Sequence, residues 1–435
     1  MRFPVPGKPT RPLCLAAFAA VFASAAFGPG ELHLRLESSE PAAGSVVGEL
    51  PPQVRLVFSA AIERSLADVR LTTGDGGPIP VNVWRDSADD RVLLGTWPEL
   101  STGTWEVAWK VVSLDGHTVR GTFEFTYDTP EAAESAAVDA AEAESSVEMG
   151  VESGVLARPD AEADPATFPW FGALLGGAAR WFLLAFAGLA WFDRSRRVER
   201  GSRPGRLTRS LAAGAVVFVA AYVGHWIVSA GAFGEASLGE VLTTRTGRLG
   251  LLQLALTAIA AAAAFGWRLR AAATFAILAI LVDGATGHPA AAGNLFAASL
   301  SAAHMAAGAI WLGGLLLIIA EDRNEHHLVA TSRAVSRAAF VVSILVGVTG
   351  LGMALLLVPS LSSVFSTAYG RLVLAKIVGF GILIAFGAHH KLRIIPVIET
   401  EGTGGALQRS VRKEALVFML VILLAAVLGQ TTLPA

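Results

Sequence analysis

Residues 287–315, with the sequence GHPAAAGNLFAASLSAAHMAAGAIWLGGL, combine a tight turn with a long apolar run. We interpret them as the junction between two membrane helices, with His288 at the mouth of the turn and His304 at membrane depth. An ionisable side chain inside a bilayer is costly and by default marks an ion or cofactor path. The alternative is a structural histidine that only forms a hydrogen bond to a neighbouring helix. Two histidines that face each other make this alternative less favoured.

The composition extends this interpretation to most of the chain. It has 435 residues, of which 53% are hydrophobic and 16% charged, and a mean hydropathy of +0.55. Such a chain is too apolar to be soluble at this length, so we expect a polytopic protein of the lipid bilayer. The net charge of −2 hides an acidic N-terminal third and later Arg clusters, which indicates topology and not a nucleic-acid partner. With Cys14 alone, the sequence offers no disulfide and no thiolate metal site.

The first 26 residues are typical of a secretory signal peptide. Three basic residues precede an apolar core at 13–22, and Ala23-Ser24-Ala25 suits signal peptidase. An uncleaved anchor is the alternative. In both cases the segment that follows lies outside the cytoplasm.

Residues 27–128 alternate polar and apolar positions in short runs separated by Gly and Pro, as in Val54–Phe58 and Gly121–Tyr127. This pattern predicts an all-β domain, a Greek-key sandwich or barrel. One predicted loop contains Asp115 and His117, and a carboxylate two residues from an imidazole suits Cu(II) or Zn(II). An ordinary Asp-Gly turn with a surface histidine explains the same residues.

Residues 129–167 are mostly Ala, Glu, Asp and Ser, and they are expected to form a flexible acidic linker. The remaining 168–435 contain apolar segments of the ~20 residues that span a bilayer. We expect eight membrane helices, at 169–192, 208–230, 247–267, 270–287, 295–319, 337–358, 371–389 and 414–431. Basic residues follow the first, third, fifth and seventh segments, so these loops are assigned to the cytoplasm and the C-terminus to the outside.

This topology gathers three histidines in the outer half of the helical domain. They are His225, His288 and His304, the last roughly 12 Å deep at the helical rise of 1.5 Å per residue. Imidazole suits copper, and Met305 adds a thioether that points elsewhere on the helix. The expected membrane metal site therefore comprises His288 and His304, with His225 as a weaker third ligand.

Two further polar features have plainer interpretations. Arg180 and Asp283 lie within predicted spans, where an ion pair that holds helices together is favoured over a transport role. His326-His327 and His389-His390 fall at the cytoplasmic surface, where a metal exit site is weighed against solvated loop histidines, which are the more common case.

The β region resembles the periplasmic copper-binding family CopC. The resemblance lies in the run His33–Ser45, the strand Val54–Ser59, and a Trp-x-Val-Val-Ser-x-Asp-Gly-His signature beginning at Trp109. It implies that His33, Asp115 and His117 ligate Cu(II), His33 through its ring and the N-terminal amine. Cleavage after Ala25 or Ala26 would leave His33 inside the mature chain, without a free amine.

The helical region resembles the inner-membrane copper protein family CopD. The matching stretches are Gly287-His288, His304–Leu315, Thr367–Leu372 with Lys376, and Arg409–Glu414. A CopC-like and a CopD-like half in one chain resembles the YcnJ-type copper uptake proteins. The resemblance implies copper as the bound metal and cargo, a bacterial cytoplasmic membrane location, and a periplasmic copper chaperone as partner.

We therefore expect a copper-binding and copper-transporting protein that acts in copper homeostasis and is not an enzyme. No Gly-rich phosphate loop with its Lys-Ser/Thr pair occurs in the sequence, so transport would follow a gradient, the membrane potential or an exchanged proton. Two alternatives stay open. Paired intramembrane imidazoles also suit a haem-binding electron-transfer protein, and a copper-sequestering resistance protein would bind metal without moving it.

Overall fold

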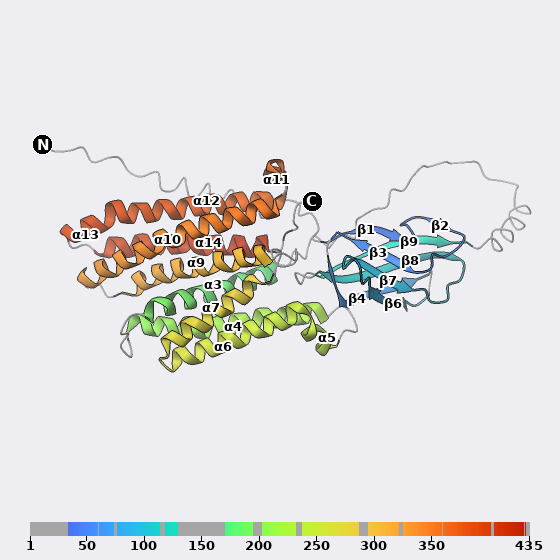
Figure 1. The fold of residues 1–435 in the computed structure, drawn as a ribbon, viewed down its shortest axis with the longest axis horizontal. Helices are drawn as coiled ribbons and strands as arrows, with labels where there is room; N and C mark the ends of the chain where they lie inside the picture. The colour runs from blue at the N-terminus through green and yellow to red at the C-terminus, as the bar shows by residue number, and fades with distance from the viewer. Residues whose placement is uncertain are drawn as a thin grey trace, which may run out of the picture. The chain divides into compact units, whose positions relative to one another are not determined.

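The computed structural model describes residues 34–59, 61–73, 76–113, 118–128, 170–194, 202–231, 237–286, 295–321, 325–358, 360–401, 404–429 and 431. These residues form two compact units, a β-domain and a helical unit (Figure 1). The predicted signal peptide and acidic linker lie outside the described residues.

The β-domain consists of two sheets. One has the strand order β1-β3-β7-β6 and the other the order β2-β9-β8-β4-β5. All the neighbouring strands pair antiparallel except β2 and β9, which are parallel. The strands are β1 (Leu36–Glu40), β2 (Val46–Val47), β3 (Val54–Phe58), β4 (Ile62–Thr72), β5 (Ile79–Pro80), β6 (Asn82–Arg85), β7 (Val92–Thr96), β8 (Gly103–Ser113) and β9 (Thr118–Tyr127). An all-β domain is thus confirmed, while its Greek-key topology stays a prediction.

Large side chains from both sheets meet in one core. Alternation on β3 turns Val54, Leu56 and Phe58 inward, and the Phe58 ring meets Trp109 of the other sheet edge-on, with ring centroids 5.2 Å apart. Trp109 pairs across the strands with Gly121, where a Cβ atom would lie 2.5 Å from the indole. The absence of a side chain at Gly121 is therefore what lets the indole lie flat on β9.

The helical unit contains a long helix at each of the eight predicted spans. These helices are α3 (Trp170–Asp193), α4 (Arg203–Gly231), α6 (Arg245–Phe265), α7 (Leu269–Gly284), α9 (Leu295–Ala320), α10 (Glu325–Leu357), α12 (Ala368–His389) and α14 (Gly404–Leu428). Shorter helical segments are α5 (Leu238–Thr243), α11 (Leu361–Ser366), the π-helical turn η2 (His390–Ile394) and α13 (Ile395–Glu401).

Six of these helices, α3, α4, α6, α9, α10 and α12, are long and apolar enough to cross a membrane within the described part of the chain. Helix α7 is only 16 residues long, and α14 carries Arg412, Lys413 and Glu414 beside its apolar run. A multi-pass helical unit is therefore supported, and the number eight stays a prediction.

Helices α3 and α9 form the centre of the unit. Each packs against the other and against α7 and α14, and α9 also packs against α10 (Figure 1). The two axes approach closely at Gly188 and Gly313, where a Cβ atom on either glycine would overlap the backbone of the other helix. Small residues thus allow the central contact, as they do in many membrane helix pairs.

Candidate metal and proton sites

The three predicted Cu(II) ligands of the β-domain, His33, Asp115 and His117, lie outside the described residues. The residues that flank them lie at one end of the domain. Arg35 and Ser59 exchange hydrogen bonds of 3.1 and 3.0 Å, and three residues after Ser59 the strand β4 begins with Ile62, which pairs with Ser113. Arg35 and Ser113, which are described residues next to the candidate ligands in the chain, therefore both adjoin the segment from Ser59 to Ile62.

Burial also affects a cation near this end of β8. Lys110 is almost fully buried, and desolvation lowers the pKa of its ammonium group, helped by Arg120 and Arg70 and opposed by Asp68.

His304 lies on α9 and is held by α10. Its Nδ1 is 3.1 Å from the carbonyl oxygen of Val346 and 3.1 Å from the hydroxyl of Thr349. The Thr349 hydroxyl donates to the Leu345 carbonyl at 2.6 Å, so it can accept from the imidazole. Nδ1 therefore carries the proton and Nε2 presents a lone pair. A hydrogen bond at the far ring nitrogen is what orients a metal-binding histidine.

The other residues near His304 include a glycine, Gly350, and a cationic side chain, Lys376. Gly350 on α10 lets the ring approach closely, since a Cβ there would be 3.3 Å from the ring carbon Cε1. Among the described residues, Nε2 has no hydrogen-bond partner. Lys376 of α12 is near enough to interact electrostatically with both His304 and Arg180. In the sequence Lys376 is recognisable only as part of a motif. Its proximity to His304 results from the packing of α12.

His225 lies on α4 and contacts α3. Its ring meets Phe171 edge-on at 5.2 Å, and a Cβ on Gly172 would be 3.0 Å from its Nε2. Within the described ranges no hydrogen bond or ring contact joins His225 to His304, and no group of three His, Cys, Asp or Glu side chains could hold a metal ion. His288 lies outside these ranges, so the predicted three-histidine site stays a prediction.

The predicted ion pair between Arg180 and Asp283 is confirmed. Arg180 Nε on α3 lies 3.1 Å from Asp283 Oδ2 on α7. The guanidinium also lies 5.9 Å from the ring centroid of Tyr222 on α4. Arg180 thus ties three helices together, as the structural interpretation expected.

One expectation is wrong. His390 was assigned with His389 to the cytoplasmic surface, where solvated histidines were the favoured interpretation, but it is only 8% exposed, because η2 turns it against α14. Its Nε2 is 2.8 Å from the Ser410 hydroxyl and its Nδ1 is 3.2 Å from Oε2 of Glu414, which is 1% exposed. The other oxygen of Glu414 accepts from the indole of Trp311 on α9 at 3.1 Å. The signal available in the sequence was an acidic residue next to the apolar run of α14.

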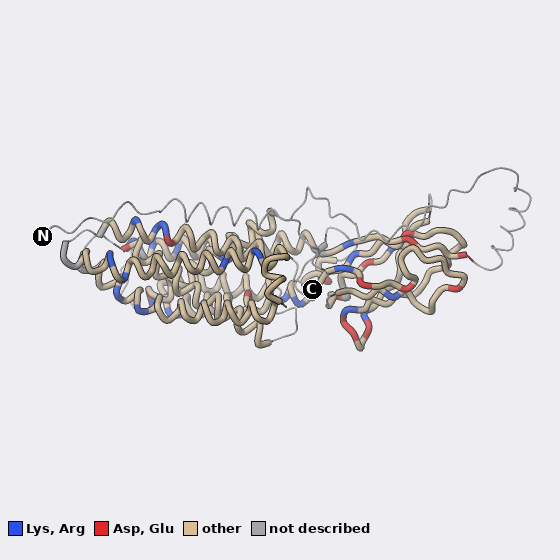
Figure 2. The backbone as a smooth tube through the Cα atoms, turned by 90° about the horizontal axis from the view of Figure 1, so that it is seen from above, with Lys and Arg blue, Asp and Glu red and all other residues tan. Residues whose placement is uncertain are grey.

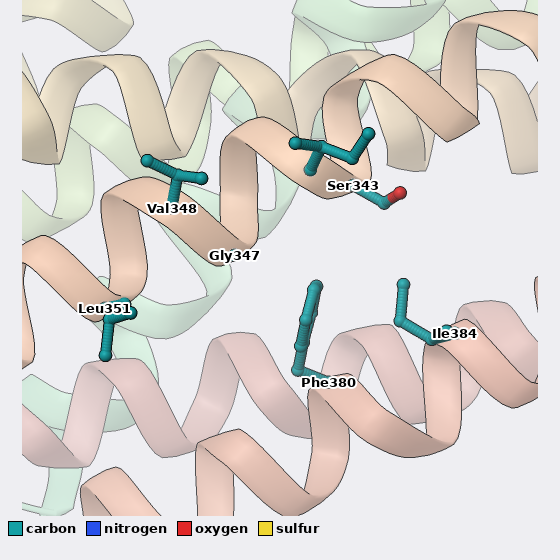
Figure 3. Close-up of a pocket in the computed structure, with 7 residues that line it drawn as sticks. Ser343, Gly347, Val348, Leu351, Phe380 and Ile384 are labelled. Atoms are coloured by element: carbon teal, nitrogen blue, oxygen red, sulfur yellow. The ribbon is translucent and has the colours of Figure 1, made fainter.

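A shallow apolar groove of about 340 Å³ separates α10 from α12. Figure 3 shows Phe380 and Ile384 directed from α12 toward α10. Its lining residues are Ser343, Ile344, Gly347, Val348, Leu351, Phe380 and Ile384. They include no imidazole, carboxylate or thioether, so the groove is not a metal path and is typical of a lipid-facing surface.

Comparison with known families divides the chain in the same way. Residues 36–128 match the family described as CopC domain, and residues 329–428 match the family described as Copper resistance protein D. The copper transport protein CutJ of Bacillus subtilis (strain 168) is 24% identical over 92% of this chain and 74% of its own length.

Two further relatives match a smaller part of the chain. Protein YobA of Escherichia coli (strain K12) is 31% identical over 22% of this chain and 77% of its own length. The crystal structure of CopC from Methylosinus trichosporium OB3b is 30% identical, covering 22% of this chain and 96% of that one with a TM-score of 0.22.

Proposed function

The chain belongs to the copper resistance proteins that carry CopC and CopD domains, and on this premise we propose that it captures copper outside the cytoplasm and carries it inward across the membrane. The observation that carries the proposal is the arrangement of His304. Its Nδ1 proton is held by α10, and among the described residues its Nε2 lone pair has no hydrogen-bond donor, inside a unit that contains membrane-length helices. The proposal includes no enzymatic step.

Capture is assigned to the β-domain. His33 and His117 supply imidazole nitrogens and Asp115 a carboxylate oxygen, ligands suited to Cu(II). The described residues next to these ligands in the chain adjoin one shared segment, and this supports the assignment. In this role the domain loads Cu(II) from the medium or from a periplasmic copper chaperone.

Electron paramagnetic resonance of the purified domain, residues 27–128, tests the capture site. One equivalent of Cu(II) is expected to give a nitrogen-coordinated spectrum that changes in His117→Ala. Glu106→Gln is the matched control, because Glu106 is an exposed carboxylate on the other half of β8, opposite Glu124 of β9 and far along the strand from Ser113. A His117→Ala domain with the wild-type spectrum and affinity would remove the site.

Passage through the membrane is assigned to His304 together with His288, and with His225 as a weaker contributor. An imidazole at this depth is otherwise a liability, because the bilayer offers no water to satisfy its free nitrogen. A ligand in the outer half of the unit can accept an ion from the capture domain.

Cell-associated copper at limiting external copper tests transport. Wild type is expected to accumulate more copper than His304→Ala or His288→Ala at matched expression. His327→Ala, which changes an exposed histidine of α10, is the control and is expected to behave as wild type. Equal copper in all strains would contradict transport through this pair, and more copper in the two mutants would indicate export. A Soret band in the purified protein would favour the haem alternative.

The proposed inward direction rests on the resemblance to copper uptake proteins and on a capture domain that lies outside, and the basic residues support that orientation. In Figure 2 Lys and Arg are most numerous at one end of the helical unit, where α3, α6 and α12 end and α4, α7 and α14 begin, although Arg245, Arg248 and Arg371 lie near the starts of α6 and α12. The positive-inside rule assigns this end to the cytoplasm. A thiol reagent added to intact cells should then label Thr432→Cys and spare Ser202→Cys, and labelling of Ser202→Cys would reverse the assignment.

A further inference from the structure

A buried polar cluster at the basic end of the helical unit is separate from the histidines discussed above. It joins three elements, with Trp311 on α9, His390 on η2, and Ser410 and Glu414 on α14. π-helical turns inside longer helices are rare and occur often at functional sites. Here the turn is what carries His390 from α12 into contact with α14.

The carboxylate of this cluster is incompletely satisfied. Oε1 of Glu414 accepts from Trp311, but Oε2, although 3.2 Å from Nδ1 of His390, has no well-aligned hydrogen bond from any described residue. A buried polar atom without a hydrogen bond costs about 1–3 kcal/mol, and more when it is charged. A native protein that keeps such an atom usually has a use for it.

The arrangement favours a proton over a metal ion as the ligand. Both ring nitrogens of His390 already face a partner, Ser410 at Nε2 and Glu414 at Nδ1, so the imidazole has no lone pair directed at open space. In contrast, Oε2 of Glu414 can form an O–H bond without moving. Protonation there would also remove a negative charge from a site that water does not reach.

The charged groups around the cluster point away from it. On α14, Arg409, Arg412 and Lys413 are exposed, as are Lys391 and Arg393 on η2. Helix α12 contributes the rings of Phe386 and His389, whose centroids lie 6.1 and 6.4 Å from the His390 ring, and α9 contributes Trp311. His390 and Glu414 are thus the two titratable groups at the centre of the cluster.

We propose that the His390–Glu414 pair is a proton-exchange site of the helical unit, loaded through Ser410 from the basic end. In loading, the half-buried Ser410 hydroxyl passes its proton to Nε2 of His390 and takes a proton from hydronium, while the Nδ1 proton passes to Oε2 of Glu414. An O–H bond of hydronium breaks, an O–H bond of Glu414 forms, and His390 exchanges one N–H bond for the other. Unloading reverses these steps and returns one proton to water.

Helix α9 connects this site to the candidate copper ligand. Trp311, which donates to Glu414, is seven residues from His304, and residues two turns apart share a helix face. Protonation of Glu414 weakens the hydrogen bond that its carboxylate accepts from the Trp311 indole. This face of α9 is then held less tightly to α14. We therefore link the proton to copper movement, a step that rests on the proposed function.

Infrared difference spectroscopy of the purified full-length protein tests the proton site without copper. A pH jump in wild type should produce the carbonyl band of a buried protonated carboxyl group. The band should be lost in Glu414→Gln, which keeps an acceptor for Trp311, and should titrate at a different pH in His390→Gln. Asp193→Asn is the matched control, because Asp193 on α3 is a second fully buried carboxylate that accepts a hydrogen bond from the Thr208 hydroxyl at 2.5 Å, and it lies outside the cluster. A band that persists in Glu414→Gln, or is lost only in Asp193→Asn, overturns the proposal.

A second measurement separates this inference from the proposed function. Copper uptake into proteoliposomes is followed together with internal pH, using an entrapped dye. Wild type and Asp193→Asn should move protons with copper, and Glu414→Gln should lose the proton signal. Copper uptake without any proton signal in wild type overturns the link. No copper uptake, with the titrating infrared band intact, overturns the proposed function and leaves the proton site standing.

Discussion

The two units bury opposite kinds of side chain. The core of the β-domain consists of aromatic and branched residues, among them Phe58, Trp105, Trp109 and Phe125. The core of the helical unit is rich in alanine and closes around glycine contacts, and it also encloses the Arg180–Asp283 and His390–Glu414 pairs. In water, removal of apolar area drives folding, so large side chains fill the β-domain. In lipid that driving force between helices is absent, so close approach and polar contacts hold them together.

This difference between the two cores explains where each unit can place its functional side chains. A β-domain with a large dry core leaves only its ends and loops for metal ligands, and the three candidate ligands lie at such positions in the chain. The helical unit can keep polar groups inside where a neighbouring helix bonds to them, as α7 does to Arg180 through Asp283. Loss of side-chain volume should therefore be the damaging change in the β-domain, and gain of side-chain volume the damaging change in the helical unit.

The largest expected effect is loss of volume in the β-domain. Phe58→Ala removes a ring with 0% exposure that contacts Trp109, and such truncations cost about 3–5 kcal/mol. Denaturant unfolding of the domain from residue 27 to residue 128 measures the change. A loss below about 1 kcal/mol, in the range of surface substitutions, would show that the core does not depend on large side chains.

A gain of volume should be the damaging change in the helical unit. Gly188→Ala places a methyl group against the carbonyl of Ala309 and forces α3 and α9 apart, and overpacking of this kind costs about 1–3 kcal/mol. The thermal stability of the detergent-purified protein should fall. Gly381→Ala on α12 is the control, because a Cβ there meets nothing within 4 Å. Equal thermal stability of Gly188→Ala and Gly381→Ala would show that the helical unit does not depend on the close contact at Gly188.

The smallest effect concerns a surface pair of the β-domain. Hydrogen bonds from the Arg91 side chain and backbone hold the pKa of Asp89 below its ordinary value of 3.8. The depressed pKa in the folded state means that this contribution is complete above pH 3.8 and is lost as the pH falls through the lower, folded value. The advantage in stability of wild type over Asp89→Asn should therefore stay constant above pH 3.8 and disappear in the acid range below it. An advantage that persists through this acid range would show that it does not come from the charge of Asp89.

Much of the architecture could be predicted from local patterns. Alternation at Val54–Phe58 and Gly121–Tyr127 corresponds to β3 and the end of β9, and each apolar segment corresponds to a long helix. The helix ends were less accurate, and α10 begins at Glu325 where the sequence predicted a span from 337. Apolarity reports the part in the membrane, whereas the helix continues as long as its backbone hydrogen bonds do.

The sequence alone determined the two-unit organisation, the membrane character and the histidines worth considering, because composition and period are properties of neighbouring residues. Only the tertiary structure decided which nitrogen of His304 is free and that His390 is buried. These facts depend on contacts across 42 residues, from His304 to Val346, and across 20 residues, from His390 to Ser410. The free nitrogen and the incompletely satisfied carboxylate arise from helix packing, in which groups far apart in the chain are brought within hydrogen-bonding distance and shielded from water.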